Sequence, residues 1–470
     1  MDDVCLLVDF GSTYTKVIAV DLAKEEVLGR AQAPSTVQDN MLLGLQNALK
    51  ELIIHGSPID DETAKKSRKL ACSSAAGGLR LVASGLVPDL TLEAARRAAL
   101  GAGAKVIGSY SYELNEEDVR QIEKAQCDII LLCGGTDGGN KDVILHNAKM
   151  LAASNLNVPF VVAGNRVVNE EVKGILEACN KYTEITENVL PELDRLNVEP
   201  ARSCIRGIFM RRIIHAKGLD KAQEFIGDIL MPTPMATLKA AQLVADGTGT
   251  ERGLGELMVV EVGGATTNVH SVAKGDSTSA GRIMKGLPEP YAKRTVEGDL
   301  GIRWNAETIL GLVGEQKVLD NMPVEFDRSK VDLAKTTAFL NKNVNYVPTN
   351  ELELGIDLGL ARSAVEVGVE RHVGIAEEVW SPQGVITVQH GKDLTDLKTM
   401  IGTGGIFCYN PHAEKVLESA LYNVNSPFSL KPKSPAFYID HGYILYGIGL
   451  LSDVEPTIAF NIVKKYLIKI

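Results

Sequence analysis

Two segments of the chain repeat one pattern: an apolar strand that ends in a carboxylate, a turn of small residues, and a second strand that carries hydroxyl groups. The first is VCLLVDFGSTYTKVIAV at residues 4–20, and the second is LMVVEVGGATTNVHSVA at residues 257–273. Apolar runs broken by glycine-rich turns are typical of β-hairpins. The repeat therefore predicts two lobes of related plan, each beginning with a hairpin. The stretch GTGTERGLGE has the composition of a linker and places the lobes at residues 1–250 and 251–470.

Helices and strands alternate in the rest of the first lobe, which indicates an inserted α/β region. The strand CDIILLC, the loop GGTDGGN, the helix DVILHNAKMLAAS and the strand NVPFVVAGN follow one another in βαβ order. Thr91 and Asn115 stand where helix N-caps are expected. Residues 300–351 are more polar and helical in pattern, and we expect an accessory insertion there. The predicted fold class is α/β.

Charge and cysteine usage exclude several classes of protein. The chain has 49 basic and 60 acidic residues, a net charge of −11, which disfavours nucleic acid or an anionic membrane as the main partner. The seven cysteines are scattered, and none has the spacing of a zinc-ligand set. No apolar run reaches the ~20 residues of a membrane-spanning helix. We expect a cytoplasmic protein without a structural metal.

The first turn has the chemistry of a phosphate site. Gly11 lets backbone N–H groups approach an anion, and the hydroxyls of Ser12 and Thr13 add donors. Asp9 can hold Mg²⁺ through water, and Lys16, just across the turn, can meet a phosphoryl oxygen. Taken alone, such a turn is more often a solvated hairpin.

Two further loops of small residues complete a set of three. The second turn follows Glu261, which offers a second carboxylate to the water shell of the metal. Its expected nucleotide contacts are Gly263, Gly264, Ala265, Thr266 and Thr267. The third loop, IGTGG, offers backbone without side chains to a purine and ribose, through Gly402, Thr403, Gly404 and Gly405. Each loop alone is commonly structural, but three in order across two lobes are not expected by chance and predict one polyphosphate site.

These loops resemble those of a known superfamily. DFGSTYTK is similar to the first phosphate loop, VVEVGGATTN to the second and IGTGG to the adenosine loop of the superfamily that contains actin, Hsp70 chaperones and sugar kinases. The resemblance implies two lobes, each with a ribonuclease-H-like sheet, around a cleft that holds ATP and Mg²⁺. It implies that Asp9 and Glu261 hold the metal, and that Lys16 contacts phosphate and acts with them in catalysis. It also implies that the glycines of the third loop contact adenosine.

Longer strings resemble a narrower family. They are SSAAGGLRLVASGLVPDLT, LLCGGTDGGN, PTPMATLKAAQLVADG, EVGGATTNVHSVAKG and AKRTVEGDLGIR. They are similar to the accessory ATPases of adenosylcobalamin-dependent glutamate (methylaspartate) mutase, of the MutL or GlmL type, with those of ornithine aminomutase as relatives. The resemblance implies a chaperone-like reactivating factor with weak ATPase activity that remodels a stalled aminomutase so that damaged cobalamin leaves. Its implied partner is that aminomutase, and assembly into a homo-oligomer stays open.

The sequence departs from the superfamily pattern at several positions. Glu261 stands where the second loop usually begins with Asp, and Asn268 stands at a later position that is acidic in Hsp70-like members. These departures put the metal geometry in doubt. No general base follows from the motifs. Asp299 and Asp137 are candidates, although a side chain that caps its own turn is the simpler interpretation of each.

The segments expected to join the lobes are only partly defined. The first is Gly164-Asn165 or Thr233-Pro234, neither of which carries the acidic residue found in Hsp70-like proteins. The second is the small-residue helix ILYGIGLLS, with a plain core helix as the alternative.

Other functions stay open beside the reactivating factor. A sugar or carboxylate kinase would use the same cleft, but it needs a positioned base. A non-catalytic actin-like assembly protein needs none. His270 is interpreted as a packed residue and His441 as a turn residue, and the DxHxxG pattern of cobalamin ligation is absent.

Overall fold

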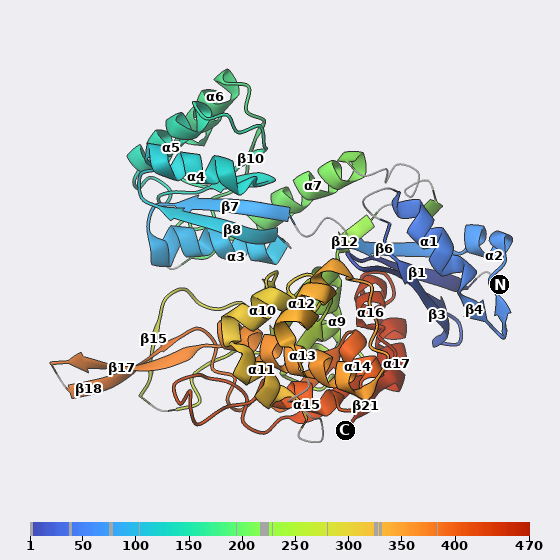
Figure 1. The fold of residues 1–470 in the computed structure, drawn as a ribbon. Helices are drawn as coiled ribbons and strands as arrows, with labels where there is room; N and C mark the ends of the chain where they lie inside the picture. Colours follow the sequence, from blue (N-terminus) through green and yellow to red (C-terminus); the bar gives the residue numbers. More distant parts are fainter. Residues whose placement is uncertain are drawn as a thin grey trace. The chain divides into compact units, whose positions relative to one another are not determined.

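The computed structural model describes residues 3–36, 40–74, 79–102, 104–193, 195–216, 225–227, 229–279, 281–323, 328, 331–382 and 384–470 (Figure 1). Residues 75–78 of the string SSAAGGLRLVASGLVPDLT therefore lie outside the described residues. The chain forms two compact units. Unit 1 comprises Met1–Gly77, Ala216–Lys285 and Glu289–Ile470, and unit 2 comprises Gly78–His215 with Gly286–Pro288.

The first sheet of unit 1 begins with the predicted hairpin. Its strands are β1 (Val4–Phe10), β2 (Tyr14–Asp21), β3 (Glu26–Pro34), β6 (Arg68–Ser73) and β12 (Ile229–Pro232). They lie in the order β12-β6-β1-β2-β3. The strands β1, β2 and β3 form an antiparallel meander, and β6 and β12 add parallel to β1 and to each other. The register places Asp9 directly opposite Lys16.

The second sheet of unit 1 repeats this plan. Its strands are β13 (Leu257–Val262), β14 (Thr267–Val272), β16 (Ala292–Glu297), β19 (Thr399–Thr403), β20 (Ala436–Asp440) and β21 (Leu467–Lys469). The meander β13-β14-β16 is antiparallel, while β19 and β20 add in parallel beside β13, and β21 closes the edge. Both sheets have the strand order of a ribonuclease-H-like sheet, so the predicted two-sheet α/β fold is confirmed. The lobe boundary at residue 250 falls between α9 (Thr233–Asp246) and β13 and stays a prediction.

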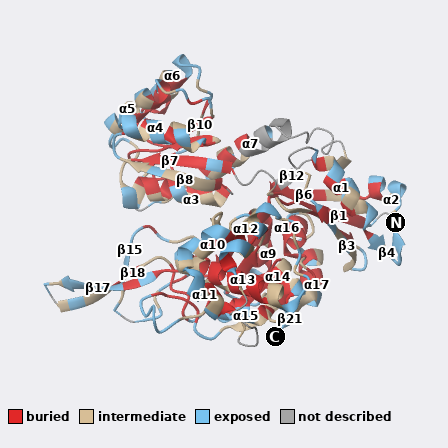
Figure 2. Cartoon of the chain, viewed as in Figure 1, coloured by how far each residue is buried: buried red, intermediate tan, exposed pale blue. Residues whose placement is uncertain are grey.

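The two helices that follow the fifth strand of each plan pack against each other. They are α9, after β12, and α16 (Leu445–Ser452), after β20. A Cβ on Gly449 of α16 would lie 1.7 Å from the carbonyl oxygen of Ala236 on α9, so the backbones touch directly. Leu7, Val259 and Ile448 belong to one buried cluster that spans both sheets and this helix pair. Figure 2 shows the buried parts of the chain in red. Thr233-Pro234 thus begins α9, and ILYGIGLLS supplies α16. These two helices lie at the junction of the sheets.

The remaining helices of unit 1 pack on its two sheets or against other helices. They are α1 (Met41–Lys50), α2 (Asp61–Lys66), α10 (Ala306–Val313), α11 (Glu315–Asn321), α12 (Leu333–Lys342), α13 (Glu351–His372), α14 (Gly405–Tyr409), α15 (Ala413–Glu418) and α17 (Pro456–Tyr466). The region expected to be a helical insertion carries α10 to α12, and its residues 324–327, 329 and 330 lie outside the described residues. Small strands complete the unit: β4 (Ile53–Ile54), β5 (Ser57–Pro58), β15 (Ile283–Lys285), β17 (Ile375–Ser381) and β18 (Gly384–His390).

Unit 2 is the inserted α/β region. Its sheet is wholly parallel, in the order β11-β10-β9-β7-β8. These strands are β7 (Leu79–Gly85), β8 (Ala104–Ser111), β9 (Ile129–Leu132), β10 (Phe160–Val162) and β11 (Thr183–Ile185). Its helices are α3 (Glu93–Ala102), α4 (Glu116–Ala125), α5 (Asp142–Ala152), α6 (Asn169–Ala178) and α7 (Glu199–Ala216).

The two caps predicted in unit 2 have different outcomes. Asn115 caps α4 in a reciprocal capping box with Asp118, as predicted. The cap predicted at Thr91 is wrong, because a π-helical turn over Pro88–Leu92 precedes α3. Within that turn the Thr91 hydroxyl accepts from the amides of Leu86 and Val87. Among the described residues, no helix combines the length and apolar character needed to cross a membrane.

Because α9 and α16 are in direct contact, even a methyl group at Gly449 is predicted to destabilise the folded chain. Gly449→Ala should lower the unfolding midpoint, because forcing apart a packed helix pair costs about 1–3 kcal/mol or more. Gly311→Ala is the control, since Gly311 lies exposed in α10 with no atom near its missing Cβ. Calorimetry of both variants checks this prediction. A Gly449→Ala midpoint at or above that of the wild type would contradict it.

Candidate functional site

A buried ion pair lies at the end of the first hairpin. The Lys16 ammonium lies 2.7 Å from Oδ2 of Asp9, and Asp9 is fully buried. The other carboxylate oxygen, Oδ1, accepts a hydrogen bond of 2.6 Å from the hydroxyl of Thr233, the first residue of α9. The Cys72 thiol on β6 donates to the same oxygen at 3.6 Å. Asp9 therefore joins β1, β2, β6 and α9 at one point.

The protonation states of this cluster follow from burial and charge. Burial disfavours the Lys16 cation, but the adjacent Asp9 carboxylate more than offsets this and raises the pKa of Lys16 well above its usual value. Burial raises the pKa of the Cys72 thiol, with the charge of Asp9 adding to the effect. Burial also raises the pKa of Tyr443 to about 12. Near neutral pH, the Lys16 ammonium thus lies in a cluster with a neutral thiol and a neutral phenol.

Glu261 occupies the matching position at the end of β13. Its Oε2 accepts a 3.0 Å hydrogen bond from the amide of Asn268 and lies 3.6 Å from Nε2 of His270. Burial raises the pKa of Glu261, but His270, Asn268 and the charge of Lys16 together lower it below the usual value. Burial also dominates at His270 and lowers its pKa despite the nearby carboxylate. Glu261 is therefore ionised and His270 neutral, in keeping with the packed role expected for this histidine.

The first and second loops lie against each other. A Cβ on Gly264 would come within 2.9 Å of the Thr13 hydroxyl oxygen, so only glycine allows this approach without a shift. The amides of Ser12, Thr13, Gly264, Ala265 and Thr266 donate to no acceptor among the described residues. Unpaired backbone donors brought close together are the type of group that binds anions in proteins. The two predicted phosphate loops are thus brought together.

The third loop packs against the second. Gly404 has a φ of 110°, and a Cβ there would lie 2.3 Å from the carbonyl oxygen of Val262, the last residue of β13. A Cβ on Gly402 would meet the ring of Phe407 at 2.4 Å, whereas one on Gly405 would have no atom within 4 Å. Gly404 and Gly402 are therefore needed for packing, and Gly405 faces open space.

Four residues of this region were missed by sequence reasoning. The Thr403 hydroxyl donates to Asp440 at 2.8 Å, and Asp440 also accepts from the first amides of α16. Arg303 forms a buried two-bond pair with Asp357, and its amide donates to Gly264. Tyr443 places its ring over Lys16. Two signals were available: Arg303 ends the string AKRTVEGDLGIR, and the carboxylate of DHGY lies shortly before a helix.

The candidate bases take part in structural contacts. Asp299 forms a two-bond ion pair with Arg371. Asp137 belongs to unit 2, where it accepts from the side-chain amide of Asn188 and from the backbone of Arg166. Buried Asn165 accepts a hydrogen bond from the Gly138 amide of this loop and donates one to the Gly139 carbonyl. These contacts account for both aspartates without a catalytic role. His441 is exposed in the turn before α16.

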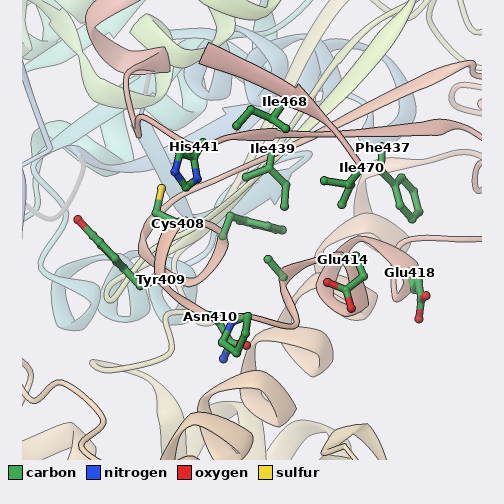
Figure 3. Close-up of a pocket in the computed structure, with 13 residues that line it drawn as sticks. Cys408, Tyr409, Asn410, Glu414, Glu418, Phe437, Ile439, His441, Ile468 and Ile470 are labelled. Atoms are coloured by element: carbon green, nitrogen blue, oxygen red, sulfur yellow. The ribbon is translucent and has the colours of Figure 1, made fainter. Parts of the chain in front are cut away.

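Two cavities lie near the loops. One of about 630 Å³ begins at α14, directly after the third loop, and has apolar walls with polar groups at its rim (Figure 3). Phe407, Phe437 and Ile439 line it, together with Cys408 and His441. A smaller cavity of about 120 Å³ adjoins Lys16. Within the described residues, no three His, Cys, Asp or Glu side chains form a metal cluster.

Two ribonuclease-H-like sheets, joined by a pair of packed helices and facing each other through glycine loops, define the actin-like ATPase class of fold. The chain belongs to the family described as MutL protein, whose model matches residues 5–467. It is 46% identical over 468 residues to Protein MutL of Clostridium tetanomorphum, with 100% of each chain covered. The family predicted from the sequence is confirmed.

Solved structures with a detectable likeness are more distant. Gluconate kinase from Lactobacillus acidophilus matches at 8% identity and a TM-score of 0.33, over 99% of this chain and 93% of that one. Xylulose kinase from Bifidobacterium adolescentis matches at 11% identity and a TM-score of 0.30, over 97% and 93%. These scores are low, and the fold assignment follows from the strand order.

Burial of neutral His270 predicts a pH dependence of stability. Its folded pKa lies below the ordinary 6.5, so its contribution is present above pH 6.5 and is lost as the pH falls below that value. For one such proton, the free energy of unfolding falls by at most about 1.4 kcal/mol for each pH unit. The free energy of unfolding, measured between pH 7 and pH 5, should fall less steeply in His270→Gln than in the wild type. His55→Gln, at an exposed histidine, is the control, and equal slopes for all three proteins would contradict the assignment.

Proposed function

We propose that the chain is an ATP-dependent reactivating factor for an adenosylcobalamin-dependent aminomutase, either glutamate mutase or ornithine aminomutase, with weak ATPase activity. Family membership and the accessory-ATPase strings support the biological role. The observation that carries the ATP site is the contact between Gly264 and Thr13, which gathers unpaired amides from both hairpins beside Lys16. A triphosphate has the charge and the acceptors that such a group of donors requires.

The residues present fit ATP and Mg²⁺. The amides and hydroxyls of the first two loops would hold phosphate, with Lys16 as the cationic partner. Asp9 and Glu261 would hold Mg²⁺ through its water, because Mg²⁺ keeps several waters and takes few protein carboxylates. Gly405 opens onto the side of the third loop expected to face adenosine, and the apolar pocket after it could accept a base.

The chain's own residues suggest how nucleotide state reaches a partner. Bound ATP would supply the free energy for remodelling. Thr233 ties Asp9 to the first turn of α9, and Asp440 ties Thr403 to the first turn of α16. A shift of either carboxylate therefore moves the end of a helix at the junction of the two sheets. Interfaces packed this tightly move as rigid bodies, which suits hinge or shear motion.

Gly405 allows a test of nucleotide binding that spares the fold. A Cβ at Gly405 has no protein atom within 4 Å, so Gly405→Leu directs its side chain into open space and the unfolding midpoint should change little. Bound ATP would meet that side chain, so we expect at least about tenfold weaker binding, a loss of about 1.4 kcal/mol. Titration calorimetry checks this, with Gly311→Leu as the control at an exposed glycine. Wild-type affinity in Gly405→Leu would remove the third loop from the site.

Reactivation itself is tested with an aminomutase blocked by cyanocobalamin. The wild-type chain with ATP and fresh adenosylcobalamin should restore mutase activity, and Asp9→Asn should not, because the metal-anchoring charge is lost while the shape is kept. Asp320→Asn, on the exposed face of α11, is the control. No recovery with the wild type would overturn the proposal. ATP use that depends strictly on a metabolite would instead indicate a kinase, and ATP-dependent sedimentation of the chain alone an assembly protein.

A further inference from the structure

Tyr443 has a backbone conformation that is unfavourable for its side chain. Its φ is 49°, in the left-handed region, where a bulky residue is a genuine outlier. It lies in the short turn between β20 and α16 and follows Gly442, whose φ is not in that region. Residues held in this way persist only where the surroundings over-determine them, and they cluster at functional sites.

The ring of Tyr443 is directed at Lys16. The Lys16 ammonium lies 4.7 Å from the centre of the Tyr443 ring and 5.6 Å from that of Tyr446. The two rings meet edge to face, with centres 6.3 Å apart and planes at 90°. A cation within about 6 Å of a ring face is attracted by the ring quadrupole. Asp9 and two aromatic rings thus surround the ammonium.

The turn is fixed on both sides of Tyr443. The Arg30 guanidinium donates a 2.6 Å hydrogen bond to the carbonyl of Gly442, and the Tyr443 amide donates to Asp440. Asp440 in turn accepts from the first amides of α16. The backbone that carries the ring is therefore anchored to Arg30 on one side and to the start of this helix on the other. Since Lys16 belongs to the first sheet, the contact also joins the two sheets.

A cavity next to Lys16 leaves its ammonium room to move, so a restraint in addition to Asp9 is needed. The cavity of about 120 Å³ is lined by Lys16, Arg30, Tyr443 and Tyr446. A lysine side chain has a flexible four-carbon stem and a strongly hydrated head. Without the Tyr443 ring, this cavity would widen and offer the ammonium other positions. Asp9 alone fixes the ammonium from one direction only.

We propose that Tyr443 is a positioning residue, which uses strained backbone to hold the Lys16 ammonium beside Asp9 in the geometry that meets phosphate. This inference rests on the proposed function for its catalytic consequence. Its structural part, the hold on Lys16, can be tested without nucleotide. Tyr446 supports the ring edge-on and is further from the ammonium.

Two substitutions at Tyr443 distinguish the effect of its ring from the effect of its backbone conformation. Tyr443→Phe keeps an aromatic face over Lys16. Tyr443→Asn removes the ring but keeps a residue that tolerates the left-handed conformation, so the turn should still form. Tyr112→Asn is the matched control, because Tyr112 has a φ of 66°, is exposed and belongs to unit 2.

The first measurement uses the nucleotide-free chain with ¹³Cε-labelled lysine. In the wild type and in Tyr443→Phe, the ring current should shift the Lys16 ε-methylene signal upfield, and Lys16→Arg assigns that signal. In Tyr443→Asn most of the shift should be lost, leaving only the smaller effect of the more distant Tyr446 ring, and in Tyr112→Asn it should be unchanged. A wild-type shift in Tyr443→Asn would overturn the inference whether or not the chain binds ATP.

The second measurement is steady-state ATP hydrolysis. Tyr443→Asn should lower kcat about tenfold and change KM for ATP less than about twofold, because the restraint acts on the phosphate end of the site. Tyr443→Phe should keep more than about half of kcat, since the ring face remains. An equal fall in both Tyr443 variants, or wild-type kcat in Tyr443→Asn, would overturn the inference. Absence of hydrolysis in the wild type would instead count against the proposed function.

Discussion

The ion pair between Asp9 and Lys16 is the interaction on which the structure of the site depends. Two charges are removed from water here, and such a pair is stable only when every remaining hydrogen-bonding position is satisfied. Thr233 satisfies the second oxygen of Asp9, and two tyrosine rings enclose the ammonium. The groups come from the first sheet, from α9, and from α16 and the turn before it. The charge on one hairpin therefore determines how the helices and the second sheet must be placed around it.

The two halves of unit 1 each link a sheet to a helix through buried polar side chains, but they use different residues. In the first half, a carboxylate at the end of the first strand accepts from a threonine that begins α9. In the second half, the carboxylate of Asp440 at the end of β20 accepts from Thr403 at the end of β19 and from the amides of Ile444 and Leu445 at the start of α16. Each half thus has a buried polar link between its sheet and its connecting helix. The strand order repeats, and in both halves the acceptor is a carboxylate at the end of a strand, but it lies on the first strand in one half and on the fifth strand in the other.

The sequence predicted those features that local chemistry determines. Strand periodicity and glycine turns gave both hairpins, the parallel region of unit 2 and the three loops. The contacts that complete the site were missed, because they join distant residues: 224 positions separate Thr233 from Asp9. Tyr443 was missed for another reason. Nothing in DHGY shows that its tyrosine adopts a left-handed conformation, because that conformation is imposed by Arg30, Asp440 and the start of α16.

Communication between the charge cluster and the helix pair follows from their shared residues. Gly449 allows α16 to touch α9 at Ala236, so neither helix can move toward the other, and relative motion is confined to sliding or rotation. Thr233 begins one helix and Tyr443 precedes the other, and both contact members of the same ion pair. A change in the position of Lys16 relative to Asp9 would therefore act on both helices at once. Under the proposed function, a local change of charge would thus bias the packing of the two sheets.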